Sequence, residues 1–275
     1  MDVVDKTAKD IKEFKIQGAE SIAKAVIKAW DKAKNKAVAE RKLVKVRSTE
    51  PMIRNVLKFL MIKRNVKMLL KKLEGDEKKI GKFGAEKIEN GNIVYTHCHS
   101  STVVSVLREA KLAGKKFELY NTETRPFFQG RITATEAAKL KIPVTMFADS
   151  AGRLAIKKAN VMFLGADAIT SEGFVINKIG SEMFTEMANR YQIPVYICTH
   201  SWKFDPLTLY GVERKIEKRA TDEIWKNPPK GVKISNYIFE KIDPNKITAI
   251  ISEFGVLKPE VFIEEVKKNY SWMFK

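Results

Sequence analysis

Two side chains capable of proton transfer, Cys98 and Asp167, each follow a short apolar run that predicts a buried strand. Hydroxyl residues at 100–102 open a predicted helix just after Cys98, and a helix N-terminus lowers the pKa of a nearby thiol. A thiol and a carboxyl at one edge of a sheet form a candidate acid/base pair for a substrate held between them. Taken alone, Cys98 is more typical of a buried structural cysteine, and Asp167 is also compatible with a turn or helix cap.

An anion site is predicted a few residues after Asp167, in the sequence NKIG at 177–180. This segment leads into a helical pattern, so the amide of Asn177, the ammonium of Lys178 and free backbone N–H groups would gather at one helix start. Phosphate is the anion that best suits such a place. Lys203 and Arg125 are further candidate phosphate contacts, although a lysine in so basic a chain is more often solvated surface.

The remaining motifs argue against a metal or a nucleotide cofactor. His97, Cys98 and His99 are consecutive, so in an extended segment their side chains alternate faces and do not all reach one ion. The sequence has no phosphate loop ending in Gly-Lys-Ser/Thr, and no G-x-G-x-x-G motif follows the first predicted strand. We therefore expect no metal and no cofactor, and neither nucleotide hydrolysis nor dinucleotide binding.

The elements that would position these residues lie after residue 90. Six short β-rich runs alternate with helical stretches, which predicts parallel pairing, right-handed crossovers and a doubly wound, Rossmann-like sheet. Parallel strands end at one edge of a sheet, so the polar residues that follow them would converge on one cleft. The predicted strands are 93–96, 117–120, 144–147, 161–164, 195–198 and 247–251.

The first 90 residues contain no convincing strand. Apolar residues recur at helical spacing, which predicts a layer of helices with basic outer faces. Residues 48–49 before Pro51 predict a helix start, and the Glu-Gly-Asp sequence at 74–76 predicts a turn. We therefore expect an α/β protein with a helical N-terminal domain over residues 1–90 and a Rossmann-like domain over residues 91–275.

The composition predicts a globular chain with a real core and a basic surface. It has 275 residues, 44% of them hydrophobic, and a formal net charge of +18. The basic residues are not interleaved with aromatic ones, so a nucleic-acid partner is not required, and the abundance of lysine and glutamate is typical of a thermophile. No apolar run approaches the roughly 20 residues of a membrane helix, the chain opens without a signal-peptide core, and its two cysteines suggest no disulfide framework. We expect a cytoplasmic protein.

Seven short motifs, spread over most of the chain, occur in the order of one known family. They are THC at 96–98, ETRP at 123–126 with QG at 129–130, DSA at 149–151, GAD at 165–167, NKIG at 177–180, KF at 203–204 and EFGVL at 253–257. The sequence IQGA at 16–19 extends the likeness into the helical half. The chain resembles the family of the regulatory alpha, beta and delta subunits of translation initiation factor 2B, their archaeal relatives, ribose-1,5-bisphosphate isomerase and methylthioribose-1-phosphate isomerase.

The resemblance implies a helical domain on a Rossmann-like domain, with homodimers or larger rings formed through the latter. In the isomerase branch, the residues matched by Cys98 and Asp167 are the catalytic pair. The implied reaction opens the ring of an aldose 1-phosphate and moves a proton from C2 toward C1. Cys98 would shuttle the proton at carbon and Asp167 would act at the ring oxygen, or these roles would be exchanged. The residues that would contact the phosphates and hydroxyls are Gln17, Gly18, Ser100, Arg125, Asn177, Lys178 and Lys203.

One departure from the isomerase pattern falls at Gln17, where the isomerases carry an arginine. An arginine binds phosphate with two charge-assisted hydrogen bonds of roughly 1.5–3 kcal/mol each, and glutamine supplies neither the charge nor the fork. Arg47 is a candidate substitute. We therefore predict a regulatory-subunit-like protein that associates with initiation factor 2 and is linked to GDP/GTP exchange. The alternative is a sugar-1-phosphate isomerase that uses Cys98 and Asp167. A third possibility is a cleft that binds a phosphorylated sugar or nucleotide without turnover.

Overall fold

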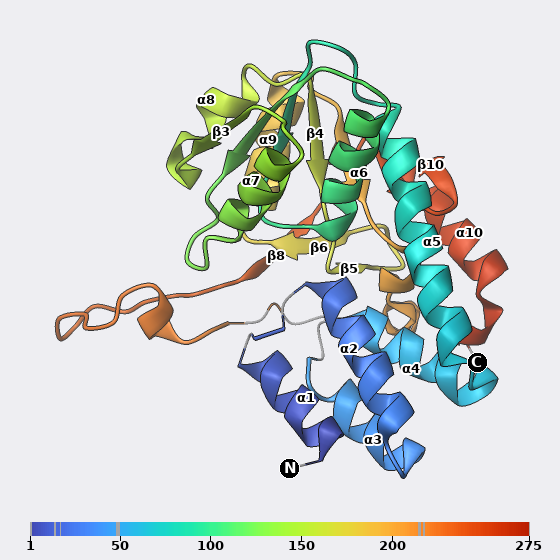
Figure 1. Cartoon of the computed structure of the whole chain (residues 1–275). Coiled ribbons are helices and arrows are strands. Elements are labelled where there is room, and N and C mark those ends of the chain that lie inside the picture. Colours follow the sequence, from blue (N-terminus) through green and yellow to red (C-terminus); the bar gives the residue numbers. More distant parts are fainter. Residues whose placement is uncertain are drawn as a thin grey trace.

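The computed structural model describes residues 2–13, 15–16, 18–47, 50–213, 216 and 218–274. Gln17 and the expected helix-start pair at 48–49 therefore lie outside the described residues. Five helices form the N-terminal layer, and Figure 1 shows the first four gathered at one end of the molecule. They are α1 (Val3–Lys12), α2 (Ala19–Lys32), α3 (Lys36–Val44), α4 (Pro51–Lys63) and α5 (Val66–Ala85).

The start signals of these helices are local. The side chains of Asp2, Asn35 and Asn65 each accept a hydrogen bond from a backbone N–H of the first turn of α1, α3 and α5. Pro51 occupies the start of α4, where its missing N–H costs no intrahelical bond. The sequence therefore located the beginning of α4 correctly.

The turn predicted at 74–76 is wrong, because these residues lie inside α5. A glycine in a helix interior costs only about 1 kcal/mol, and the fully buried Leu69, Leu73 and Ile80 on one face of α5 offset that cost. Helix α5 lies against α6 (Ser101–Leu112), as Figure 1 shows. A Cβ atom at Gly84 would lie 2.3 Å from Val106 Cγ2, so glycine is required for this close approach.

A seven-stranded sheet forms the centre of the remaining chain, in the order β10-β9-β7-β4-β1-β2-β3. All neighbouring pairs are parallel except β10 and β9. The expected helical layer and Rossmann-like sheet are thus confirmed. The strands are β1 (Ile93–Thr96), β2 (Glu118–Thr122), β3 (Val144–Phe147), β4 (Val161–Leu164), β7 (Val195–Cys198), β9 (Ala249–Ser252) and β10 (Gly255–Leu257).

A second, three-stranded antiparallel sheet was not predicted. It comprises β5 (Ala168–Ile169), β6 (Val175–Lys178) and β8 (Phe239–Ile242), and it follows β4 directly in the chain. Strand β5 is only two residues long, which leaves no periodic signal, and it forms by pairing with β6, which itself pairs with the distant strand β8. The other helices are α7 (Gln129–Lys139), α8 (Gly152–Ile156), α9 (Ser181–Arg190) and α10 (Pro259–Asn269), with short 3₁₀ turns including η2 (Ser201–Lys203) and η4 (Thr221–Glu223).

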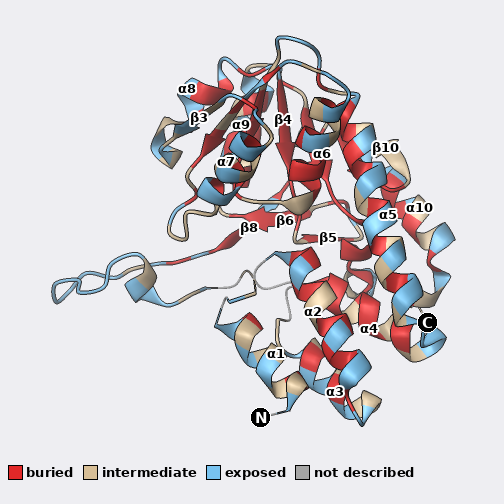
Figure 2. Ribbon diagram, in the orientation of Figure 1, coloured by how far each residue is buried: buried red, intermediate tan, exposed pale blue. Residues whose placement is uncertain are grey.

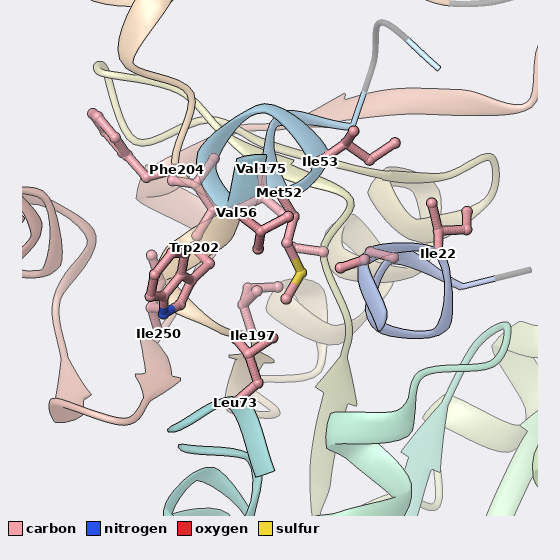
Figure 3. Packing of buried hydrophobic residues seen from close by; sticks show 14 of the residues in the cluster. Ile22, Met52, Ile53, Val56, Leu73, Val175, Ile197, Trp202, Phe204 and Ile250 are labelled. Carbon is pink, nitrogen blue, oxygen red and sulfur yellow. The ribbon is translucent and has the colours of Figure 1, made fainter. Parts of the chain in front are cut away.

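One apolar core joins the helical layer to the sheet. Figure 2 shows buried residues running without interruption from α2 and α4 into the strands, and Figure 3 shows Met52 and Val56 of α4 facing Trp202 and Ile197. The amide of the fully buried Asn55 donates to the carbonyl oxygens of Trp202 and Phe204, both at 2.8 Å. This shared core fixes α2 and α4 against the loop that follows β7. Within the described residues, no helix is both long enough and apolar enough to cross a bilayer.

An extended arm leaves the body between the 3₁₀ turn η3 (Pro206–Tyr210) and β8. Figure 1 shows this arm projecting away from both sheets, with η4 along it. Its base is held by an isolated β-bridge between Lys218 and Tyr237. Three large apolar side chains on the arm, Ile224, Trp225 and Val232, are 42–49% exposed.

Candidate active site

A cleft of about 780 Å³, open to solvent, lies where the first turns of α2 and α6 meet the carboxyl ends of β1 and β4. This is the edge of the parallel sheet at which the sequence predicted that polar residues converge. Residues from eight separate segments of the chain form its wall. The lining residues are Gly18, Ala19, Glu20, Ser21, Arg47, Cys98, His99, Ser100, Ser101, Gln129, Ile132, Gly165, Ala166, Asp167, Asn177, Lys178, Lys203 and Phe239.

Cys98 is held in this wall by a backbone conformation that side chains other than glycine rarely adopt, with a φ of 67°. Its N–H donates to Thr124 Oγ1 at 2.9 Å, and its carbonyl oxygen accepts from Thr133 Oγ1 at 2.9 Å. Asp149 in turn accepts the N–H groups of Thr124 and Arg125, at 2.8 and 2.7 Å. The loops after β2 and β3 therefore stabilise the strained residue, and such strain is typical of functional positions.

The Cys98 side chain is in its thiol form at neutral pH. Burial raises the pKa of Cys98 to about 11, although the nearby Lys178 opposes the shift. The Sγ atom lies 3.6 Å from Gln129 Oε1, which can accept a hydrogen bond from the thiol. The lowering of the pKa that we expected from a helix N-terminus is thus outweighed, because desolvation of the thiolate is the larger effect.

Asp167 follows β4 and is half-buried in the same cleft. Its backbone N–H donates to the carbonyl oxygen of Ile176 at 2.8 Å, which ties it to β6. Behind it lies a carboxyl that the sequence analysis missed, Glu50, which is 2% exposed and 3.6 Å from the guanidinium of Arg47. Burial, with the neighbouring Asp167, raises the pKa of Glu50 to about 7 even though Arg47 lowers it. A carboxyl beside the start of a predicted helix gives no sequence signal of such burial.

The positive charge of the cleft comes from buried lysines. Lys178 and Lys203 are 5% and 6% exposed, and Lys203 Nζ donates to the carbonyl oxygen of Ala166 at 2.7 Å. The Lys178 ammonium lies 5.1 Å from the ring of Phe239. Because these two side chains and Arg47 line the same cleft as the N-terminal turns of α2 and α6, the site is complementary to an anion.

The sequence analysis predicted an anion at the start of the helix that follows residues 177–180, which is α9. The helix starts found at the cleft belong to other helices. Asn177 and Lys178 lie at the end of strand β6, and α9 begins only at Ser181. The Asn177 amide donates to Ser181 Oγ at 3.0 Å, and the N–H of Glu182 donates to Glu240 Oε1 at 2.6 Å. A carboxylate of the chain itself therefore occupies the first turn of α9. The α2 and α6 helices supply the N-termini at the cleft instead.

Most of the predicted site residues lie together. Gly18, Ser100, Asn177, Lys178 and Lys203 line the cleft with Cys98 and Asp167. Arg125 does not: its side chain is exposed, 5.0 Å from the ring of Phe128, and only its backbone joins the Asp149 contact. Gln17 lies outside the described residues, next to Gly18. The lining residues Glu20 and Gln129, like Glu50, were given no role from the sequence.

His97 does not line the cleft, and both of its ring nitrogens are engaged in hydrogen bonds. Its Nε2–H donates to the carbonyl oxygen of Ile179 at 2.8 Å, so its Nδ1 accepts from the Thr122 hydroxyl at 2.6 Å. Burial lowers the pKa of His97 to about 4, so the ring is neutral. Both nitrogens therefore serve to connect β1, β2 and the loop before α9.

The fold and the cleft define an α/β protein of Rossmann-like strand order with a helical N-terminal layer and an anion-complementary site. The chain belongs to the Initiation factor 2 subunit family, whose sequence model matches residues 6–259. It is 33% identical to the ribose 1,5-bisphosphate isomerase of Methanocaldococcus jannaschii, over 100% of this chain and 98% of that protein. It is 37% identical to the methylthioribose-1-phosphate isomerase of Thermosipho africanus, over 70% of this chain and 60% of that protein. The family resemblance predicted from the motifs is confirmed.

Solved structures share this architecture. The translation initiation factor eIF-2B of Pyrococcus horikoshii OT3 superposes with a TM-score of 0.85 at 25% identity, over 94% of this chain and 98% of that one. A more distant structure, the tetrameric eIF2B-beta2-delta2 complex of C. thermophilum, has a TM-score of 0.72 at 16% identity, over 96% of this chain and 94% of that one. That complex is a tetramer, as its name states.

Proposed function

We propose that this protein is an aldose–ketose isomerase acting on a sugar 1-phosphate, with ribose 1,5-bisphosphate as the first candidate substrate. The observation that carries the proposal is the presence of Cys98 and Asp167 in one cleft with Lys178, Lys203 and Arg47. The name of the M. jannaschii relative, which matches this chain over its whole length, supports the same activity. This was the alternative in the sequence analysis, and it now has more support than the translation-factor prediction.

The proposed reaction needs only proton transfers. The carboxyl of Asp167 protonates the ring oxygen as the bond between C1 and that oxygen breaks, which opens the sugar. The Cys98 thiolate then removes the proton from C2 and returns it to C1, and Asp167 accepts the proton of the C2 hydroxyl as the ketone forms. No electron acceptor is consumed, because the oxidation of C2 balances the reduction of C1.

The charges in the cleft suit a phosphorylated substrate. Buried ammonium groups form stronger charge-assisted bonds to phosphate than exposed ones, because little water competes with the ligand. Arg47 lies next to Glu50 at the floor of the site, so it remains a candidate for the role that the isomerases give to an arginine at the position of Gln17. The test is a panel of aldose 1-phosphates with and without a second phosphate, assayed for ketose formation at high temperature. We expect turnover to require the 1-phosphate, and ketose formation from none of the panel would contradict the proposal.

The pH dependence of turnover follows from the buried thiol and the carboxyl acid together. Since the pKa of Cys98 is raised to about 11, the thiolate fraction in the free enzyme grows about tenfold per pH unit below that value. The proposed reaction also needs Asp167 in its protonated form, and the protonated fraction of a carboxyl falls as pH rises. We therefore expect kcat/KM to change little between about pH 6 and 9, because the two fractions change in opposite directions. Initial rates across this range check the prediction. A wild-type profile that rises about tenfold per pH unit across this range would show that protonated Asp167 is not required as the acid.

The second candidate function is that of a translation-factor-like binding protein, which associates with initiation factor 2 and is linked to GDP/GTP exchange. It is favoured by the likeness to the eIF-2B structure of P. horikoshii, whose match covers nearly the whole of both chains. Retention of initiation factor 2 subunits on the immobilised protein at near-physiological salt would support it. Loss of binding as salt is raised to that level would leave only a nonspecific contact of a basic protein.

We further propose that the arm contributes to self-association as a homodimer or larger homo-oligomer. Ile224 and Trp225 directly follow η4 and are 42% and 49% exposed, and a second copy of this chain would cover them. Truncating an aromatic anchor at an interface costs about 2 kcal/mol or more. We therefore expect Trp225→Ala with Ile224→Ala to weaken dimerisation by at least about thirtyfold. Analytical ultracentrifugation checks this, with Leu112→Ala, 73% exposed on α6, as the control. Equal dimer affinity in both variants would exclude the arm.

A further inference from the structure

A second cluster of polar side chains lies in the interior, beside the cleft but outside the proposed reaction. Asp76 of α5, His200 after β7 and Glu253 after β9 are all buried, with exposures of 3%, 0% and 7%. One ligand atom from each lies within 4.8 Å of the other two. Three elements that are far apart in the sequence thus bring an imidazole and two carboxylates together.

His200 has no hydrogen-bond partner for either ring nitrogen among the described residues. Its nearest charged neighbour is Glu20, whose Oε2 lies 3.8 Å from His200 Nε2, beyond hydrogen-bond distance. Leaving a buried polar atom unsatisfied costs about 1–3 kcal/mol. A fully buried imidazole that faces two carboxylates therefore calls for a cation or a proton between them.

The surrounding charges favour a cation. Four carboxylates meet here, and among the residues that the structure describes two ammonium groups pair with them, Lys24 on Glu20 at 2.5 Å and Lys72 on Asp76 at 2.9 Å. The four carboxylates are Glu20, Asp76, Glu77 and Glu253.

We propose that Asp76, His200 and Glu253 form a structural site for one divalent transition-metal ion, with Zn²⁺ as the preferred ion. Imidazole with carboxylate is a donor set that zinc accepts, whereas Mg²⁺ and Ca²⁺ prefer oxygen ligands alone. Ligand atoms on a tetrahedral zinc ion lie about 3.3 Å apart, so small side-chain movements bring these three onto one ion. The ion would connect helix α5 to the ends of β7 and β9.

The other contacts of Glu253 orient it toward this site. Its Oε2 accepts the N–H of Ser201 at 3.1 Å, and its Oε1 accepts the hydroxyls of Ser201 and Tyr270. Such hydrogen bonds to a ligating carboxylate are the outer contacts that hold metal ligands in place. The site is independent of Cys98, so the proposal stands or falls separately from the isomerase activity.

The test uses the full-length protein, stripped with a chelator, dialysed and titrated with Zn²⁺ and, as a spectroscopic probe, Co²⁺. We expect about one ion per chain and a visible cobalt spectrum without a thiolate charge-transfer band. His200→Gln should weaken Zn²⁺ binding more than about 100-fold, since even outer contacts are worth 10–100-fold, while Cys98→Ser binds normally.

Three outcomes would overturn the site. The first is wild-type protein that binds no zinc at micromolar free metal, a result that needs no variant to fold. The second is a thiolate-to-cobalt band that disappears in Cys98→Ser, which would place the ion at the cysteine instead. The third is unchanged zinc affinity in a ligand variant, either His200→Gln or, if that variant does not fold, the conservative change Asp76→Asn on α5.

Discussion

Asp167→Asn is expected to lower kcat for isomerisation of an aldose 1-phosphate by about 10²–10⁴-fold, with little change in KM. An amide keeps the shape of the side chain but cannot protonate the ring oxygen, so ring opening loses its acid. Cys98→Ser should lower kcat by a similar or larger factor, because a hydroxyl is far less acidic than even the buried thiol. Steady-state kinetics on the wild type and both variants measure these effects.

Two control variants test whether a loss of activity is specific to Asp167 and Cys98. Glu172→Gln neutralises an exposed carboxylate in the turn between β5 and β6, outside the cleft lining. Cys198→Ala alters the other cysteine, which is fully buried in the core beneath the sheet edge. Both controls should retain near wild-type kcat. Full activity in Asp167→Asn or in Cys98→Ser would remove that residue from the mechanism, and loss of activity in the controls would point to a general effect on folding.

Lys178→Met is expected to raise KM by about 10–150-fold, the value of one charge-assisted hydrogen bond of roughly 1.5–3 kcal/mol to phosphate. It should also lower kcat, because the Lys178 ammonium lowers the pKa of Cys98 and its loss leaves less thiolate at a given pH. Methionine fills the volume of the buried stem and removes only the charge. Steady-state kinetics separate the effect on KM from the effect on kcat.

The control for this variant is Lys241→Met on β8, whose backbone pairs with Ile176 of β6 but whose side chain is exposed and outside the cleft. It changes the net charge equally, so a nonspecific electrostatic effect on an anionic substrate would be the same in both variants. A similar rise of KM in Lys178→Met and Lys241→Met would contradict a direct contact between Lys178 and phosphate.

The parts of the fold that the sequence predicted are those encoded by local patterns. Parallel strands such as β1 and β4 are short continuous apolar runs between polar turns, and their carboxyl ends carry the reactive residues. The turn at 74–76 was misassigned because Gly75 is a local signal, whereas the burial of the α5 face is a tertiary effect. Strand β5 was missed because its two residues form a strand only through pairing with β6.

The candidate site likewise contains residues that local sequence patterns predicted and residues whose position depends on tertiary packing. Cys98 and Asp167 were found because each stands at the end of a recognisable strand. Glu50 was missed because its burial depends on residues of the loop after β4, far along the chain. Arg125 was overestimated because its motif belongs to a loop that positions Cys98 through the backbone, with the arginine side chain itself exposed. The sequence therefore identified the reactive groups from their positions at strand ends. The charged side chains that pack around them could be identified only from the structure.

The most direct test of the proposed function is the conversion of ribose 1,5-bisphosphate by the purified wild-type protein, followed by ³¹P and ¹³C NMR at high temperature. We predict that ribulose 1,5-bisphosphate accumulates with the wild type and is absent with the Cys98→Ser, Asp167→Asn double variant. Folded wild-type protein that binds the substrate, as judged by a thermal shift, and yet forms no ketose would contradict the isomerase. That result would leave a cleft that binds sugar phosphates without turnover.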